Sequence, residues 1–536
     1  MAIYYYFSFQ YSAIQKTVLR HDRLWSIAGI SQKLSCLNEI ELPRIVKMKT
    51  KIEKPVLVSG GGKFTARFSS EKEASEAKTE IIKTVSTTFP MLEFQVSSIK
   101  QASTFKEAKD KCIIEGMNEQ KRNFRGYGVT FNPHFKICHE CGEYPAIRGR
   151  GKQIDNKNVC AVCHSAYTTK VKLKTLKEVD AKDLPTLQRI YKSYMKELPD
   201  TNVKKVPLNF EDLFDKGEKL ERKRMAVWFS DLNNMGKKVQ LWLGQKEEKI
   251  LETFNKVTDI NIEIITTALK NTFSKHQGTF LPFRLVVAGG DDLCLVMPES
   301  YILDFAVNLS ASLNEIRSNL KPEDQLNEEW LRKQRKIQNP RQETDKTSES
   351  GCAKKSKQDD SHDIEPYCFG GSFVVTSIHT PFKKIHAVGE ELMGTAKKAT
   401  NRKANSVCWM VMAAEEDPLS EKLFKLEKPL FIDEDIEGVF PDNRLTFSRY
   451  VRMCRFYSEF LTKTSVQQIV SIMTKEKGNS LKVENKLKRY AASEMQKGVS
   501  DILVDQNFRQ SDGAFKCARL ATLLELMTIQ GRFKNE

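Results

Sequence analysis

Three aspartates lie where the sequence predicts two neighbouring strands to end. Asp291 and Asp292 form a turn between two apolar runs, directly after Gly289 and Gly290, and Asp231 ends the run MAVWFSD. Carboxylates that meet at one edge of a sheet repel each other unless a cation lies among them. Hard oxygen ligands with open positions suit magnesium or manganese, which can bridge an attacking hydroxyl and a triphosphate. The aspartates are therefore the candidate catalytic residues, with a solvated hairpin turn as the structural alternative.

The elements that must position these aspartates follow the order of a ferredoxin-like sheet. Short β-branched and aromatic runs predict strands, and apolar spacing of three and four predicts helices. The order βαββαβ, with a further helix and strand, predicts an α+β domain with its helices on one face of the sheet. The predicted strands are 225–231, 283–288, 293–297, 368–378 and 406–413, and the predicted helices are a long one through Val257 and Ile264, then 300–318 and 382–398.

The N-terminal region repeats this order, which indicates two copies of one domain. Where the second copy has WFSDLNN the first has YFSFQYS, so that Ser8 aligns with Ser230. Where the second copy has Asp291 and Asp292, the first has Gly62 and Lys63. The first copy has therefore lost its carboxylates. Its predicted strands are 2–9, 54–59, 63–68 and 92–97, and its predicted helices are about 23–38, 72–88 and one from about 104.

Two CxxC pairs lie between the copies: Cys138, Cys141, Cys160 and Cys163. Thiolate pairs at this spacing can fold two knuckles around one tetrahedral zinc ion. A redox pair would need one CxxC at the start of a helix rather than two in a polar loop. Four thiolates leave no open position, so we expect a structural zinc, with His139 or His164 as possible replacements for a cysteine.

The composition predicts a globular protein with a polyanionic partner. The chain has 536 residues, 40% of them hydrophobic, and a formal net charge of +17. Lysine and arginine that neutralise phosphates release counterions, although a generically basic surface explains the charge equally well. No apolar run reaches the roughly 18 residues that cross a bilayer, and the N-terminus lacks the features of a signal peptide. We therefore expect no membrane partner and a cytoplasmic location, which the scattered cysteines also fit.

Two further segments differ in composition from the two copies. Residues 319–366 have few apolar side chains and many charges, so we expect disorder there, with a lid or RNA-contacting arm as the alternative. From about residue 415 onward, helical apolar spacing predicts a C-terminal bundle.

Together these motifs resemble the large polymerase-and-cyclase subunit of type III CRISPR effector complexes. The resemblance covers nearly the whole chain and depends on VSGGGKFTARFSS in the first copy, the four-cysteine element, and FSDLNNMG and VVAGGDDLCLVMP in the second. It implies two ferredoxin-like palm domains of the nucleotide-cyclase type, an intervening zinc element and a C-terminal helical bundle. It also implies synthesis of cyclic oligoadenylates from ATP, activated when guide RNA pairs with target RNA. The implied partners include other effector subunits, among them a small helical one.

The resemblance also assigns roles to individual residues. Those that would hold two magnesium or manganese ions, together with the Leu232 carbonyl, are Asp231, Asp291 and Asp292. The implied nucleotide-binding positions are Gly289, Gly290, Asn234 and Lys397 in the second palm and Gly60, Gly61 and Gly62 in the first. Lys397 would contact phosphate charge, and the first-palm glycines would help to form a second nucleotide pocket across the palm interface. No residue stands out as a general base.

Many members of that family begin with an HD-type nuclease domain, which needs histidine and aspartate metal ligands. His21-Asp22 has little chain before it, and His362-Asp363 lies in the polar segment, so we predict no such domain. Two other functions stay open: a free-standing cyclase of the GGDEF type that needs no RNA, and a non-catalytic scaffold that binds nucleotides or RNA. The predicted domains are the first palm at 1–125, the zinc element and linker helices at 126–222, the second palm at 223–414 and the helical domain at 415–536.

Overall fold

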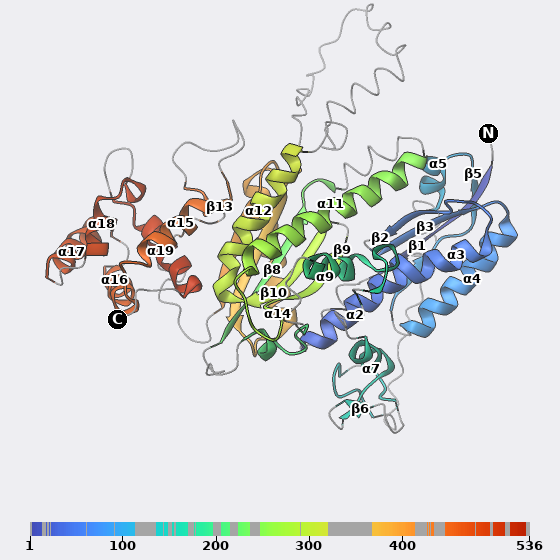
Figure 1. Ribbon diagram of the computed structural model, residues 1–536, viewed down its shortest axis with the longest axis horizontal. Helices are drawn as coiled ribbons and strands as arrows, with labels where there is room; N and C mark the ends of the chain where they lie inside the picture. Colours follow the sequence, from blue (N-terminus) through green and yellow to red (C-terminus); the bar gives the residue numbers. More distant parts are fainter. Residues whose placement is uncertain are drawn as a thin grey trace, which may run out of the picture.

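The computed structural model places two sheets side by side, with a group of helices at one end (Figure 1). The N-terminal sheet (blue) adjoins a larger central sheet, and the C-terminal helices (red) lie beyond the central sheet. The predicted disordered segment lies outside the described residues, apart from residue 319. The structure describes residues 3–12, 18, 21, 23–60, 62–89, 92–112, 136–142, 144–147, 153–154, 157–169, 176, 178–196, 205–214, 223–235, 247–289, 291–319, 367–412, 426, 428, 430–433, 445–476, 479–493, 497–509 and 515–531.

The first palm is an antiparallel sheet in the order β2-β3-β1-β4, with a short β5 also paired to β1. Its longest helix, α4, begins where the Ser70 hydroxyl accepts a hydrogen bond from the backbone N–H of Glu73. The helix predicted at about 23–38 is longer in the structure, because α2 continues through a π-helical turn into α3. The elements are β1 (Tyr4–Tyr11), α2 (Leu24–Cys36), α3 (Leu42–Lys49), β2 (Val56–Gly60), β3 (Lys63–Phe68), α4 (Glu71–Thr88), β4 (Phe94–Val96), β5 (Lys100–Ala102) and α5 (Phe105–Lys109).

The second palm is a larger sheet in the order β13-β12-β11-β8-β10-β9. All of its neighbouring strands are antiparallel except β11 and β12, which run parallel. The elements are β8 (Arg224–Leu232), α11 (Glu247–Phe273), β9 (Arg284–Gly289), β10 (Asp292–Pro298), α12 (Ile302–Asn319), β11 (Phe369–Ser377), α14 (Phe382–Ala399), β12 (Ser406–Met412) and β13 (Leu430–Phe431).

Helices cover both faces of the second sheet, so the prediction of helices on one face is wrong. Trp228 and Phe229 are consecutive in β8, and their side chains therefore point to opposite faces. The Trp228 ring contacts Phe305 of α12, with ring centroids 5.6 Å apart. The Phe229 ring lies so close to Gly389 of α14 that a β-carbon there would overlap it. Helix α14, which connects the parallel strands β11 and β12, therefore lies on the face opposite α12.

The two sheets share one strand order, as the predicted duplication requires. The order β11-β8-β10-β9 of the second palm matches β4-β1-β3-β2 of the first. Equivalent backbone hydrogen bonds join Leu232 N–H to the Asp291 carbonyl (3.2 Å) and Tyr11 N–H to the Gly62 carbonyl (2.9 Å). The alignment of Ser8 with Ser230 is therefore off by one residue.

The corrected register identifies what stands in the first palm at each carboxylate position. Gln10 faces Lys63 across the β1–β3 pair, as Asp231 faces Asp292 across β8 and β10. The first palm thus has glutamine and lysine where the second has two aspartates. The conclusion that the first palm has lost its carboxylates is unaffected by the shift.

The C-terminal helices dock on β12 through a buried charged pair. Lys428 Nζ lies 3.0 Å from the Glu525 carboxylate, and the two side chains are only 6% and 7% exposed. The indole N–H of Trp409 donates to the same carboxylate at 3.0 Å. None of the helices in the described ranges is both long and apolar enough to cross a membrane. The helices are α15 (Phe447–Tyr457), α16 (Lys463–Lys475), α17 (Ser480–Ser493), α18 (Lys497–Val504) and α19 (Cys517–Gln530).

Glu525→Ala is expected to destabilise the protein by about 3–5 kcal/mol, because it leaves the Lys428 ammonium buried without its carboxylate. Urea unfolding followed by tryptophan fluorescence measures the change. The double variant Lys428→Met/Glu525→Leu removes both charges and is expected to recover most of the loss. A loss of unfolding free energy below about 1 kcal/mol in the single variant would contradict the docking role, because exposed surface ion pairs contribute that little.

Candidate functional site

Two of the three predicted carboxylates face each other across a strand pair. Asp231 near the end of β8 pairs with Asp292 at the start of β10, and Asp292 pairs with Gly289 across the hairpin. Asp291 lies in the hairpin turn. One carboxylate oxygen from each aspartate lies within 4.8 Å of the others. The structure therefore gathers all three predicted carboxylates into one cluster.

This cluster fits a hard divalent cation. Oδ1 of Asp231 is buried and has no hydrogen-bond partner in the described part of the chain. Desolvation and the nearby Asp231 carboxylate raise the pKa of Asp291 to about 6. Desolvation by the surrounding protein, together with the neighbouring negative charges, raises the pKa of Asp292 to about 7. A cation would offset the repulsion and give the orphaned oxygen a partner.

Lys397 of α14 already supplies one positive charge to this cluster. Its ammonium group pairs with Oδ2 of Asp231, and its side chain is 10% exposed. The lysine side chain passes over Gly370, the residue of β11 that pairs with Asp231. A β-carbon at Gly370 would overlap Cγ of Lys397. Gly370 therefore makes space for the lysine, a role that we did not predict, although a glycine inside a buried strand often indicates such an approach.

Gly370→Ala is expected to displace Lys397 from Asp231 and to lower the rate of the reaction proposed in the next section by about 100-fold, the cost of a misplacement of about 1 Å. It is also expected to destabilise the protein by about 1–3 kcal/mol, as overpacking does. Gly394→Ala is the matched control, because Gly394 lies on α14 with Lys397, and a β-carbon there would meet nothing within 4 Å beyond the backbone of its own helix. Initial rates and thermal unfolding of both variants test this. Wild-type turnover by Gly370→Ala would rule out a need for the lysine at this position.

A cavity of about 610 Å³ opens between the two palms, a size typical of ligand sites. It contains Asp292 and Gly289 of the second palm and Gly62 of the first. One predicted glycine from each turn, Gly289 and Gly62, thus shares the cavity with Asp292, one of the candidate catalytic aspartates. Polar side chains that also line it are Tyr11, Ser31, Ser35, Asn38, Glu39, Ser230, His386 and Glu390.

The helices α2 and α14 contribute lining residues that we did not predict from the sequence. His386 Nε2 lies 3.5 Å from the Glu390 carboxylate, and burial lowers the pKa of His386 to about 4. The imidazole is therefore neutral at pH 7 and adds no positive charge to the cavity. No local motif predicts these residues, because only the packing of α14 on β8 brings them to the GGDD hairpin.

The remaining predicted nucleotide-binding residues do not line the cavity or lie outside the described residues. Asn234 is buried in a left-handed turn after β8, with φ of 60°, and does not line the cavity. Gly60, with φ of 152°, ends β2 and also lies outside the cavity lining. Gly61 and Gly290 are outside the described residues. The roles of these four residues, and of the Leu232 carbonyl, stay predictions.

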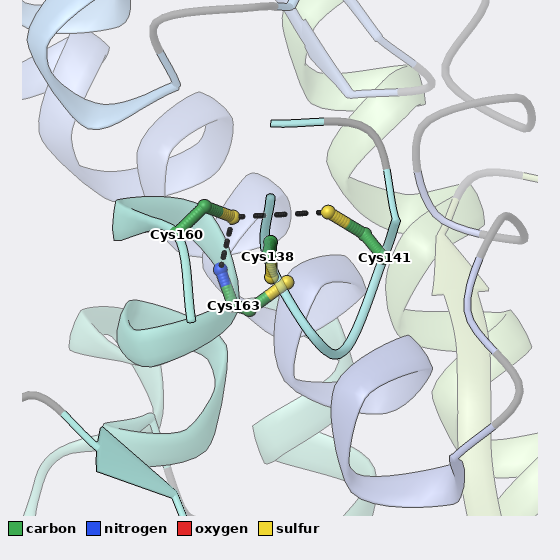
Figure 2. A group of neighbouring side chains, drawn as sticks. All are labelled: Cys138, Cys141, Cys160 and Cys163. Atoms are coloured by element: carbon green, nitrogen blue, oxygen red, sulfur yellow. Dashed lines mark hydrogen bonds between the residues drawn. The ribbon is translucent and has the colours of Figure 1, made fainter. Parts of the chain in front are cut away.

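The four predicted zinc ligands converge on one point (Figure 2). One Sγ atom from each lies within 4.8 Å of the others, and Sγ of Cys141 and Cys160 are 3.9 Å apart. A tetrahedral zinc with Zn–S bonds of about 2.3 Å needs sulfur atoms about 3.8 Å apart, so this set fits zinc. No described cysteine forms a disulfide. Four thiolates already complete the set, so a histidine ligand from His139 or His164 is not needed.

Local structure builds each knuckle. Cys160 caps α7 (Ala161–Thr168), and its Sγ accepts a hydrogen bond from the backbone N–H of Cys163 at 3.4 Å. In the other knuckle, Gly142 has φ of 66°, which favours glycine, and its N–H donates to the Cys138 carbonyl at 3.0 Å. Both knuckles thus have tight backbone turns that direct two sulfur atoms each to one point.

The chain thus has a double-palm fold, with a four-cysteine element and a helical C-terminal part. One of the two palms keeps an acidic cluster. Solved structures with a similar fold include Csm1 proteins. The chain is similar to the apo Csm1-Csm4 cassette, with a TM-score of 0.53 and 12% identity over 99% of this chain and 70% of that one. It is also similar to Csm1 of T. onnurineus, with a TM-score of 0.52, 11% identity and the same coverage.

These comparisons confirm, at the level of the fold, the resemblance that the motifs indicated. A third similar structure is the Csm1-Csm4 cassette in complex with cA4, with a TM-score of 0.51 and 12% identity over 99% of this chain and 70% of that one. No protein-family model and no curated protein sequence matches the chain. The α+β class with two palms is therefore established.

Proposed function

We propose that the chain is a metal-dependent nucleotidyltransferase that joins ATP molecules into cyclic oligoadenylates at the junction of its two palms. One observation carries the proposal: the second palm keeps three clustered aspartates, one with an orphaned buried oxygen, beside a cavity that both palms line. A scaffold without catalysis would not need these carboxylates. The first palm, with Gln10, Gly62 and Lys63 at the equivalent positions, shows the alternative.

In this mechanism the 3′-oxygen of one ATP forms a bond to the α-phosphorus of another, and the bond from that phosphorus to pyrophosphate breaks. The hydroxyl proton passes to solvent in this mechanism, and we assign no residue as a general base. Asp231, Asp291 and Asp292 would hold magnesium or manganese, two ions by family resemblance, which would neutralise the triphosphate. Lys397 holds Asp231 in place and adds positive charge beside the phosphates.

The two palms form opposite walls of the cavity and would bind different nucleotides. Asp292 and Gly289 lie on the reactive side, and the absence of a side chain at Gly289 leaves open space for a phosphate. Gly62 and α2 form the opposing wall, which would hold the second nucleotide without metal ligands of its own. Structures similar to this chain contain such molecules: the Csm1-Csm4 cassette has been solved with cA4, with pppApA and with one ATP.

We further propose that the chain works inside an RNA-guided type III effector complex, with a structural zinc in its four-cysteine element. Csm1 is crystallised with Csm4, which supports a partner subunit of this kind for the present chain. The net charge of +17 fits guide and target RNA nearby. A small helical subunit on the C-terminal helices and activation by target RNA follow from the family resemblance. A free-standing cyclase that needs no RNA is the second candidate, because the GGDD turn is common to both.

Incubation of the purified chain with labelled ATP and magnesium separates these candidates. The reactions contain the chain alone, the chain in its guide complex, and the guide complex with matching target RNA. We expect cyclic oligoadenylates only in the last reaction. Product from the chain alone would favour the free-standing cyclase, and absence of nucleotide product from every reaction would leave the scaffold.

A further inference from the structure

Helix α2 lies against the zinc element along one face. The Trp25 ring packs edge-on against Tyr167 of α7, with centroids 5.2 Å apart. At Gly29 the two helices come so close that a β-carbon would overlap the Ala166 carbonyl. One turn further along, the Lys33 ammonium donates to the Ser165 hydroxyl. These contacts recur every four residues, so they form one continuous stripe on α2.

The opposite face of α2 lines the cavity between the palms. Ser31, Leu34 and Ser35 lie in its wall, as does Asn38 just beyond the helix end. With about 3.6 residues per turn, this set is centred roughly opposite the stripe that contacts α7. The Asn38 carbonyl also accepts a hydrogen bond of 2.7 Å from Ser59, beside the GGG turn of the first palm. Helix α2 therefore contacts the zinc element with one face and lines the cavity with the opposite face.

The segment before α2 contacts both zinc knuckles. Nδ1 of His21 lies 4.0 Å from Sγ of Cys163, and His21 is 2% exposed. Two residues later, Arg23 forms an ion pair with Glu140, which lies between the two cysteines of the other knuckle, at 3.4 Å. His21 belongs to the His-Asp pair that the sequence left without a role.

The charge of a four-thiolate zinc site explains why a buried histidine would lie there. Four thiolates and one Zn²⁺ carry a net charge of about −2, and sulfur atoms in such a site need hydrogen-bond donors. Cys138, Cys160 and Cys163 are buried, so water reaches them poorly. The Nδ1–H tautomer of His21 can donate to Cys163, as outer-shell partners of metal ligands commonly do.

We propose that the zinc element is a clamp on α2: His21 donates to the zinc-bound thiolate of Cys163, and metal occupancy thereby fixes the helix that forms one wall of the cavity. His21 is a positioning residue in this account. The identity of the cavity ligand as a nucleotide rests on the proposed function, whereas the clamp itself does not.

Substitution of His21 tests its contact with the metal site. In the full chain, His21→Ala is expected to weaken zinc binding by about 10–100-fold, measured as release to a chromogenic chelator. In the cobalt-substituted protein it should shift the sulfur-to-cobalt charge-transfer band. His21→Gln keeps an N–H donor and should restore part of both signals, so it also carries the test if the alanine variant does not fold. His139→Ala, which removes an exposed histidine of the same element, should change neither. Wild-type release and spectrum in both His21 variants would overturn the proposal.

Zinc removal tests the clamp on α2. Hydrogen exchange is expected to become faster in residues 24–36 when a chelator removes zinc, and to slow again when zinc is restored. The affinity for a non-hydrolysable ATP analogue with magnesium should fall by about tenfold in parallel, within the usual range of coupling between sites. Unchanged exchange in α2 would overturn the clamp. Faster exchange in a protein that never binds the analogue would support the clamp and defeat the proposed function.

Discussion

Replacement of Asp291 and Asp292 together by asparagine is expected to lower the rate of oligoadenylate formation by about 1,000-fold or more. Loss of a single preorganised group at a charged transition state already costs about 100- to 1,000-fold, and this change removes two of three candidate metal ligands. The measurement is the initial rate of labelled product from ATP in the complete effector complex with target RNA. A control variant, Glu71→Gln/Glu76→Gln, removes two exposed carboxylates on α4 and should keep the wild-type rate.

The same variant should be more stable than the wild type when no metal is present. The pKa of Asp292 is raised from 3.8 to about 7 in the folded protein, so the folded state binds protons more tightly than the unfolded chain. Stability therefore falls as the pH rises from about 4 to about 7, and asparagine removes this loss. Magnesium should stabilise the wild type at pH 7.5 and leave the variant unchanged. Full activity, or equal stabilisation of both proteins by magnesium, would contradict the assignment.

Replacement of Cys160 and Cys163 together by serine is expected to abolish zinc binding and to unfold the element around α7. The free energy of binding structural zinc in small domains is about 10–16 kcal/mol, and two thiolates cannot hold the ion as four do. Metal analysis should find no zinc in the variant, and limited proteolysis should cleave near α7. Because α2 packs on α7 at Gly29, we also expect a lower unfolding temperature for the first palm.

Cys36→Ser is the matched control for the zinc variant. Cys36 is a half-buried free thiol at the end of α2 and lies outside the four-cysteine group. This variant should retain one zinc per chain and the protease resistance of the wild type. Zinc retained by the Cys160→Ser/Cys163→Ser variant would show that other residues bind the ion.

The sequence predicted the parts of the site that depend on local pattern. Short apolar and β-branched runs predict the strands around the GGDD turn, and the turn brings Asp291 and Asp292 beside the strand that carries Asp231. The spacing of the CxxC pairs was equally informative, since it depends only on the geometry of a knuckle. Comparison of the two copies identified the palm that kept its carboxylates.

The features that the sequence did not predict all depend on packing between distant elements. Gly370 matters because Lys397 of α14 crosses it, and His21 lies beside the four-cysteine cluster because α2 docks on α7. The cavity exists only where two palms meet, so no single segment encodes it. The one-residue error at Ser8 has a similar cause, because strand register is set by pairing with β3 rather than by sequence likeness.

A crystal structure of the chain with manganese and a non-hydrolysable ATP analogue tests the central claim most directly. Anomalous scattering locates manganese without assumptions about its ligands. We predict manganese peaks beside the carboxylates of Asp231, Asp291 and Asp292, with nucleotide in the cavity between the palms. Manganese or nucleotide bound elsewhere, with this cluster and cavity empty, would contradict the account.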